Sequence, residues 1–162
     1  MNDNLLFEDI NSFTFTKRPM PVPYNYRIMY KVAQITLIIG ICCRKGSSCS
    51  LLKLHFISWG LTSKKEMDAL AYFANKKKGS VYPYIKFDPA LNRALAFAVS
   101  EQIILQQSNG KYLLGEKGKK FFDELIENQD LLKIEKNFLA SISTKLPENK
   151  IHSILGDWRI YT

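Results

Sequence analysis

Residues that form metal sites and disulfides are scarce in this chain of 162 residues. It has three cysteines, Cys42, Cys43 and Cys49, and two widely separated histidines, His55 and His152. There is no C-x-x-C motif, so the paired ligands of a structural zinc site are missing. The odd number of cysteines also argues against a disulfide framework. We expect no metal, no cofactor and three buried, reduced thiols.

A long apolar run is also missing. The longest strongly apolar stretch lies between Lys31 and Arg44 and has 12 residues, whereas a helix that spans a bilayer needs about 20. The chain starts with the acids Asp3, Glu8 and Asp9 and has no basic leader before an apolar run, unlike a secretory signal. We therefore expect a cytoplasmic protein that makes no contact with a membrane.

No set of residues has the pattern of a catalytic site. The acids Asp123, Glu124 and Glu127 resemble a carboxylate cluster, but Lys119 lies four residues before Asp123 and Lys120 four before Glu124. This spacing predicts ion pairs on an exposed helical face. Neither glycine-rich segment has the spacing of a phosphate-binding loop. The sequence therefore predicts no catalytic residue and a protein that is not an enzyme.

The charge is distributed unevenly. The chain has 23 basic and 15 acidic residues, a net charge of +8. Residues 1–16 carry −3, residues 17–78 carry +10 and residues 79–162 carry +1. A concentrated positive charge favours a polyanion or an acidic protein surface as partner. A solvated basic surface with no specific partner is the alternative.

Residues 1–25 are expected to form an extended arm. Prolines at positions 19, 21 and 23 prevent a helix or a central strand. Aromatic residues such as Phe13 and Phe15 on such an arm indicate that it docks on its own domain or on a partner.

Three helices are expected next. Apolar spacing of three and four from Ile28 to Cys42 predicts a mostly buried helix over residues 26–43. Ser47 or Ser48 is the expected cap of a second helix that ends near residue 58. Ser63 and Glu66 form a capping box that opens a third helix to about residue 77. Together they predict a core the size of a helix-turn-helix.

A hairpin gives the firmest structural prediction. Residues 81–87 have β propensity, but Pro83 limits them to an edge strand or a linker. Asp88 and Pro89 start a helix that runs to about residue 101. Two short strands, residues 103–107 and 111–114, flank an Asn109-Gly110 turn, and a further helix follows. This order predicts a mainly α fold with a small β-hairpin, a winged-helix-like domain over residues 26–127. A bare hairpin in an unrelated α+β fold is the alternative.

Residues 128–162 are expected to form a C-terminal helical extension. Two helices are predicted, over residues 129–143 and 147–155. Leu131, Ile134, Phe138 and Ile142 mark the expected apolar face of the first. The chain then ends with Trp158 and Tyr161, which we expect to pack on the domain or on another subunit.

The case for nucleic-acid binding is mixed. In a winged helix that reads DNA, the helix before the wing carries polar side chains to the base edges. Here that helix offers only Asn92, Arg93, Ser100 and Glu101, which is a poor reading surface. Phosphates are more plausible targets, and the candidate nucleic-acid contacts are Arg44, Lys45, Lys64, Lys65, Lys76, Lys77, Lys78, Arg93 and Lys111.

Three segments together carry a family resemblance. They are RPMPVPYNYRIMYKVAQITLII, GSSCSLLKLHFISWGL and FDPALNRALAFAVSEQIILQQSNGKYLLGEKGKKF. The chain resembles the small middle component of bacterial three-component ABC-type defence systems, in particular the Lamassu-type (LmuC-type) accessory subunits. The resemblance covers roughly residues 17–127.

The resemblance implies a non-catalytic subunit of an anti-phage or anti-plasmid complex. Its partners would be an SMC-like coiled-coil ATPase and an effector nuclease subunit, with double-stranded DNA contacted through the complex. It would resemble the kite subunits of SMC complexes and help to hold the effector inactive. The candidate partner-binding residues are Phe13, Phe15, Val22, Tyr24, Trp158 and Tyr161.

Two other functions stay open. A free-standing winged-helix transcriptional regulator would bind DNA through Asn92 and Arg93 as a symmetric dimer. A small enzyme, in which His55 or His152 meets Cys49, is the least favoured. His55 lies in an apolar segment and is expected to be a half-buried core residue.

Overall fold

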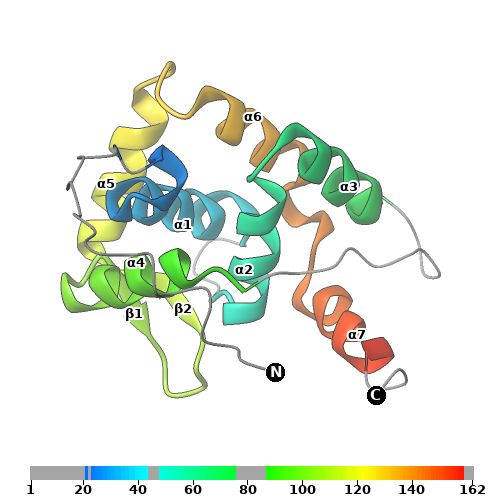
Figure 1. Cartoon of the computed structure of the whole chain (residues 1–162). Coiled ribbons are helices and arrows are strands. Elements are labelled where there is room, and N and C mark those ends of the chain that lie inside the picture. The colour runs from blue at the N-terminus through cyan, green and yellow to red at the C-terminus, as the bar shows by residue number, and fades with distance from the viewer. Residues whose placement is uncertain (1–20, 22, 44–47, 76–86, 159–162) are drawn as a thin grey trace, which may run out of the picture.

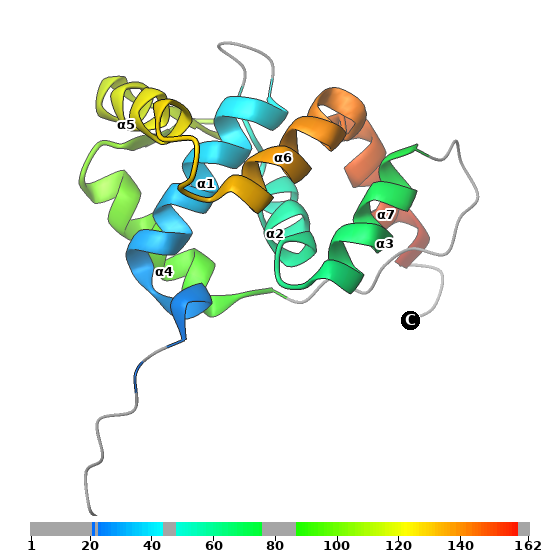
Figure 2. The ribbon, with the colours of Figure 1, turned by 90° about the horizontal axis from the view of Figure 1, so that it is seen from above.

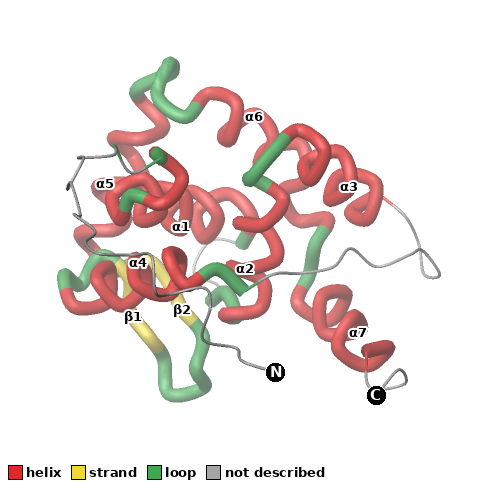
Figure 3. The backbone as a smooth tube through the Cα atoms, in the orientation of Figure 1, coloured by secondary structure: helices red, strands yellow, loops and turns green. Residues whose placement is uncertain are grey.

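The computed structural model describes residues 21, 23–43, 48–75 and 87–158, and it is mainly helical with one two-stranded hairpin (Figures 1 and 3). In the described part of the chain the helices are α1 (Ile28–Cys42), α2 (Leu51–Gly60), α3 (Lys64–Asn75), α4 (Pro89–Ser100), α5 (Glu116–Glu127), α6 (Lys133–Ile142) and α7 (Glu148–Trp158). The strands are β1 (Ile104–Gln106) and β2 (Tyr112–Leu114), and short 3-10 turns cover Tyr24–Tyr26 and Ser143–Lys145. The expected fold class is confirmed. Most of the predicted arm, and the segment expected as an edge strand, lie outside the described residues.

The core is built around α1. Every residue from Lys31 to Ile39 is buried, because α2, α4, α5 and α6 all pack against this helix (Figure 2). The prediction of a mostly buried helix is therefore confirmed, except that Ile28 at its start is exposed.

The third helix joins this core through neighbours other than α1. It packs against α2 and α6 instead of α1, and Phe73 is buried on its inner face together with Leu70 and Ala74. The helix that takes its place beside α1 is α4. The three-helix unit is therefore formed by α1, α2 and α4. In the chain, α3 comes between α2 and α4.

Helix caps explain where several elements begin. Ser63 accepts a hydrogen bond from the Glu66 N–H, and Asp88 accepts one from the Ala90 N–H, both as predicted. For α2 the prediction was wrong: Ser50, not Ser47 or Ser48, accepts the Lys53 N–H. The helix begins later because Cys49 is held in an extended bridge to Tyr112.

The hairpin has the predicted position and a three-residue loop. Ile104 pairs with Leu114 and Gln106 with Tyr112. Gly110 closes the loop with φ of 74°, the left-handed conformation that favours glycine. Antiparallel backbone hydrogen bonds between Cys49 and Tyr112 add a third, single-residue strand beside β2. Leaving α3 aside, the chain order is α1, the extended position at Cys49, α2, α4 and the hairpin. This order is winged-helix-like.

Close packing against the start of the hairpin explains why position 118 is a glycine. A Cβ atom at this position would overlap the carbonyl oxygen of Ile103. The missing side chain therefore lets α5 approach the start of the hairpin closely.

The apolar face predicted for the last helices was partly wrong. Leu131 and Ile134 are exposed, whereas Leu139 and Ile142 are buried against the core. The reason is that α6 starts only at Lys133, after Leu132 in a left-handed conformation, so Leu131 is not on the helix. Leu146 and Ile151 belong to the same core as α1, so the C-terminal helices pack on the winged-helix-like unit.

A buried ion pair joins α1 to the start of α4. The side chain of Lys31 is 2% exposed, and its Nζ lies 2.9 Å from Asp88 Oδ2. The same ammonium donates to Gln34 Oε1 and Ser58 Oγ, each at 3.2 Å. Asp88 is therefore both the cap of α4 and the counter-ion of an internal lysine.

We predict that Asp88→Asn destabilises the protein by about 3 kcal/mol, because it leaves the Lys31 charge buried without an anion. Asparagine is as good a helix cap as aspartate, so the substitution isolates the charge. Urea unfolding measures the effect. The control is Glu116→Gln, which removes an exposed ion pair with Lys119 and should leave the unfolding midpoint unchanged. Equal midpoints for wild type and Asp88→Asn would contradict the prediction.

Candidate macromolecule-binding site

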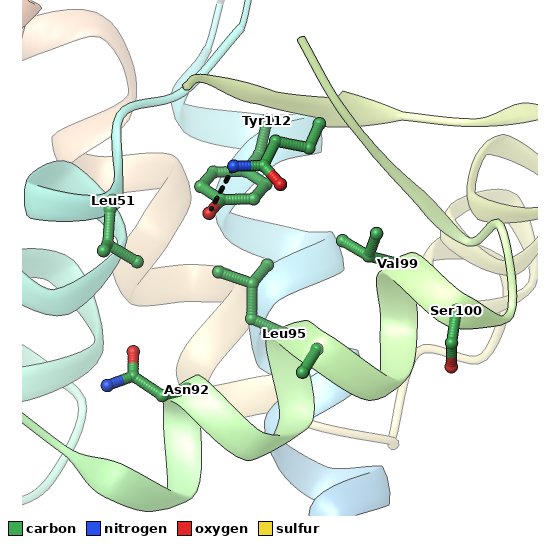
Figure 4. A pocket seen from close by; sticks show the side chains of 8 residues that line it. Leu51, Asn92, Leu95, Val99, Ser100 and Tyr112 are labelled. Atoms are coloured by element: carbon green, nitrogen blue, oxygen red, sulfur yellow. Dashed lines mark hydrogen bonds between the residues drawn. The ribbon is translucent and has the colours of Figure 1, made fainter. Parts of the chain in front are cut away.

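A groove of about 500 Å³ lies between α4, the start of α2 and the hairpin (Figure 4). Its lining is mostly apolar. One face of α4 forms one wall, and the start of α2 and the hairpin form the other wall. The lining residues are Leu51, Asn92, Leu95, Ala96, Val99, Ser100, Gln106 and Tyr112. We call this the α4–hairpin groove.

Backbone pairing holds the hairpin wall in place. Cys49 and Tyr112 exchange two backbone hydrogen bonds of 2.7 and 2.9 Å. Gln106 Nε2 donates to the Tyr112 hydroxyl at 3.4 Å, which orients both side chains toward the groove (Figure 4). These hydrogen bonds fix the position of the hairpin wall of the groove.

His55 positions the other wall. The backbone N–H of Asp88 donates to His55 Nδ1 at 3.2 Å, so Nε2 carries the ring proton and donates to Asn92 Oδ1 at 2.8 Å. The ring also packs edge-on against Phe87 at 4.7 Å. Burial lowers the pKa of His55 below its usual value, which favours this neutral form. The residue is 1% exposed, so it is more deeply buried than predicted.

The exposed surface of α4 is poorly suited to reading DNA. Its outward residues are Asn92, Arg93, Ala96, Phe97 and Ser100, with a single cation. Recognition of adenine by asparagine uses both the oxygen and the nitrogen of the amide, but the Asn92 oxygen is already bound by His55. This helix offers shape and apolar contact instead of a set of donors and acceptors.

The predicted basic residues do not converge on one surface. Lys64 and Lys65 are exposed at the start of α3, whereas Arg93 is on α4 and Lys111 follows the hairpin loop. In Figures 1 and 2, α3 lies on the opposite side of the molecule from α4. Arg44, Lys45, Lys76, Lys77 and Lys78 lie outside the described residues.

Two cations of the basic half of the chain are internal. Lys31 and Lys53 are both buried; Lys31 pairs with Asp88, and Lys53 donates to the carbonyl oxygen of Cys42 at 2.9 Å. Part of the positive charge of residues 17–78 therefore belongs to the core and not to a surface.

Of the predicted partner-binding residues, Tyr24 has a side chain that is exposed and packed against a neighbouring ring. Its side chain is 62% exposed and packs edge-on against Tyr30 at 5.1 Å. Trp158 ends α7. Phe13, Phe15, Val22 and Tyr161 lie outside the described residues.

The sequence prediction missed an apolar patch beside Tyr24. Tyr30 donates to Glu135 at 2.9 Å, which brings the start of α1 to the start of α6. On these two helix starts Met29 is 58% and Ile134 is 70% exposed. We call these three exposed residues, Tyr24, Met29 and Ile134, the α1–α6 patch; what links their elements is the Tyr24–Tyr30 ring contact and the Tyr30–Glu135 hydrogen bond.

Asn92 and Ser100 were named only as possible DNA contacts, and the other groove residues were missed, although the sequence contained a signal for them. Asn92, Ala96 and Val99 recur at helical spacing, and Gln106 and Tyr112 are cross-strand partners in the hairpin. The side chains on one face of α4, and the alternation of side chains along the two strands, would have predicted both walls of the α4–hairpin groove.

No metal site is found among the described residues. No cluster of three or more His, Cys, Asp or Glu side chains is arranged to hold a metal. The predicted ion pairs of Lys119 with Asp123 and of Lys120 with Glu124 are replaced by a 2.6 Å pair of Lys119 with Glu116. His152 faces Glu148, four residues before it, at 3.9 Å.

Comparisons with known proteins give no family. No family model matches the sequence, and no curated protein or solved structure matches it either. None of the helices in the described segments has the length and apolar character needed to cross a membrane.

We predict that the protein loses stability as the pH falls below about 6.5, the usual histidine pKa in an unfolded chain. The unfolded chain binds a proton at His55 first, because burial lowers the pKa of this residue in the folded state. The free energy of unfolding should then fall by up to about 1.4 kcal/mol per pH unit. Thermal unfolding between pH 7.5 and 5.5 measures this.

The control for this prediction is the second histidine. His152→Gln changes an exposed side chain on α7 and should keep the pH dependence, whereas His55→Gln should remove it. A wild-type protein with the same stability at pH 5.5 and pH 7.5 would show that His55 is not buried in its neutral form.

Proposed function

We propose that the chain is a non-catalytic accessory subunit of an anti-phage or anti-plasmid defence complex. In this role it bridges an SMC-like ATPase and an effector nuclease, and DNA is contacted mainly through the complex. The resemblance to Lamassu-type accessory subunits suggests these partners. The chemistry of the two exposed surfaces supports a protein that binds other proteins.

The α4–hairpin groove is the observation that carries the proposal. In a winged helix this is the surface that would face DNA, yet its lining is uncharged: the apolar or aromatic residues Leu51, Leu95, Ala96, Val99 and Tyr112, with the neutral polar residues Asn92, Ser100 and Gln106. DNA-binding interfaces are strongly positive, whereas the buried centre of a protein–protein interface is depleted of charge and rich in aromatic and aliphatic side chains. The groove matches the second description.

A bridging subunit needs two binding surfaces, and the α1–α6 patch supplies the second. Tyrosine and methionine are enriched at protein interfaces, and Tyr24 and Met29 are both more than half exposed. The Tyr30–Glu135 hydrogen bond orders the two helix starts that carry the patch. A side chain already held in place loses less conformational entropy on binding.

We expect Ala96→Arg to reduce recovery of the proposed SMC-like ATPase partner by at least about tenfold, because it places an unpaired charge on the α4 wall of the groove. Co-purification on the tagged chain measures this. The matched control is Ala69→Arg, at an exposed alanine of α3, which should recover the ATPase as wild type does. A wild-type chain that recovers no such ATPase would contradict the proposed function. Equal losses in the two variants would exclude the groove as the binding surface.

A DNA-binding transcriptional regulator is the second candidate. The exposed Arg93 on α4, with Lys111 beside the hairpin loop, is the observation that favours it. Such a protein would protect a defined operator, with an affinity that falls steeply with salt.

The two candidates differ in what Arg93→Ala does. A regulator should lose its sequence preference in footprinting with Arg93→Ala, because this side chain is the only cation on the exposed face of α4. An accessory subunit should show no protected operator in either form and should retain the ATPase. An operator protected by the wild-type chain and lost in Arg93→Ala would favour the regulator.

A further inference from the structure

Two thiols meet where α1 ends and α2 begins. Cys43 is the C-cap of α1, and Cys49 is the residue bridged to Tyr112 in β2. Both are buried in the same core, and their side chains are hydrogen-bonded to each other. They are separated by a short segment of chain, so that pairing them would join two points already held close together.

A buried cation lies beside this thiol pair. Lys53 Nζ donates to the carbonyl oxygen of Cys42 at 2.9 Å, and the ammonium also hydrogen-bonds the Cys43 side chain. None of the described carboxylates forms an ion pair with Lys53. A neighbouring ammonium stabilises a thiolate, which is the reactive form of cysteine.

A carboxylate completes the surroundings on the Cys49 side. Glu148 Oε1 accepts the backbone N–H of Ser50 at 2.8 Å, which places α7 next to the thiols. The other oxygen, Oε2, is buried without a hydrogen-bond partner. The Glu148 charge raises the pKa of both Cys43 and Cys49, whereas the Lys53 ammonium lowers the pKa of both and also hydrogen-bonds Cys43.

The two thiols are therefore not equivalent. Hydrogen bonding from Cys49, assisted by Lys53, lowers the pKa of Cys43, whereas hydrogen bonding to Cys43 and burial raise the pKa of Cys49. Cys42 differs from both: burial raises its pKa to about 12, and its thiol donates to the carbonyl oxygen of Leu139 at 3.8 Å. Of the three thiols only Cys43 has a lowered pKa, and it is also the least buried, at 8% exposure against 1% for Cys42 and 0% for Cys49.

We propose that Cys43 and Cys49 are a redox-active dithiol, which a peroxide converts reversibly to an intramolecular disulfide. This modification site is independent of the proposed function. Cytosolic disulfides are usually transient and redox-sensing, and the pairing of a reactive thiol with an adjacent resolving thiol is the arrangement found in such sensors.

The chemistry balances with hydrogen peroxide as the oxidant. The Cys43 thiolate attacks one peroxide oxygen, the O–O bond breaks, and Cys43 sulfenic acid and hydroxide form. The Cys49 sulfur then attacks the Cys43 sulfur, an S–S bond forms, and the sulfenic oxygen leaves as water with the Cys49 proton. In total two thiols and one peroxide give one disulfide and two waters. A dithiol reductant reverses the change.

The disulfide would act on the groove through Tyr112. Cys49 holds Tyr112 by two backbone hydrogen bonds, and Tyr112 lines the α4–hairpin groove. Bonding Cys49 to the end of α1 therefore links the redox state of the thiols to the position of one groove wall.

The experiment uses the full chain and hydrogen peroxide. The protein is oxidised, quenched with acid, unfolded and alkylated, and free thiols are counted by mass spectrometry. We expect wild type and Cys42→Ser each to lose two thiols and to become two hydrogen atoms lighter, with full recovery after a dithiol reductant. Cys43→Ser and Cys49→Ser should form no intramolecular disulfide, and Cys42 should react at least roughly tenfold more slowly than Cys43.

The Cys42→Ser variant makes the result unambiguous, because it leaves only one possible intramolecular pair. Peptide mapping of this variant must find Cys43 joined to Cys49, and this readout does not depend on the folding of the other variants. Unchanged thiols in wild type and Cys42→Ser under peroxide would overturn the proposal. Disulfides formed only between chains, or thiol loss at the same rate in Cys43→Ser, would overturn it as well.

Discussion

The structure depends on one buried charge. Lys31 is buried near the start of α1, where an ammonium is strongly destabilising unless it is paired. Asp88 is the anion that pairs with it, at 2.9 Å, while Gln34 and Ser58 accept hydrogen bonds from the same ammonium. Because Asp88 is also the first residue of the α4 cap, the requirement for neutralisation places α4 against α1. The position of the α4–hairpin groove follows from this contact.

The same segment is held a second time by a neutral group. His55 accepts the Asp88 N–H and donates to Asn92 one turn into α4. The ion pair sets where α4 begins, and the histidine sets how the helix is rotated about its axis. With the rotation set, Ala96 and Val99 form a wall of the groove, and Arg93 points to solvent. The polar contacts of Lys31, Asp88 and His55 thus determine which apolar side chains of α4 line the groove.

Local features were predictable from the sequence, and long-range features were not. Asp88-Pro89 and Asn109-Gly110 predicted the start of α4 and the hairpin loop, because caps and turns depend on a few adjacent residues. Lys31 entered the sequence analysis only through the net charge of residues 17–78, and its burial was not predicted, since its partner Asp88 is distant in the chain and only the fold brings them together. The displacement of α3 by α4 beside α1, and the groove itself, have the same cause: they arise from packing between distant segments.

The distribution of charge bears directly on how this protein recognises a partner. Residues 17–78 carry a charge of +10, which by itself favours a polyanion. Yet Lys31 and Lys53 are buried, the two exposed lysines at the start of α3 are on a helix that packs against α2 and α6, and the groove has no charged lining residue. Binding in the groove must therefore come from shape and apolar burial, whose dependence on salt is weak, while the exposed cations can only add a general attraction. This absence of charge in the groove is why we propose that the chain holds a protein segment at the surface that DNA-binding winged helices use for the major groove.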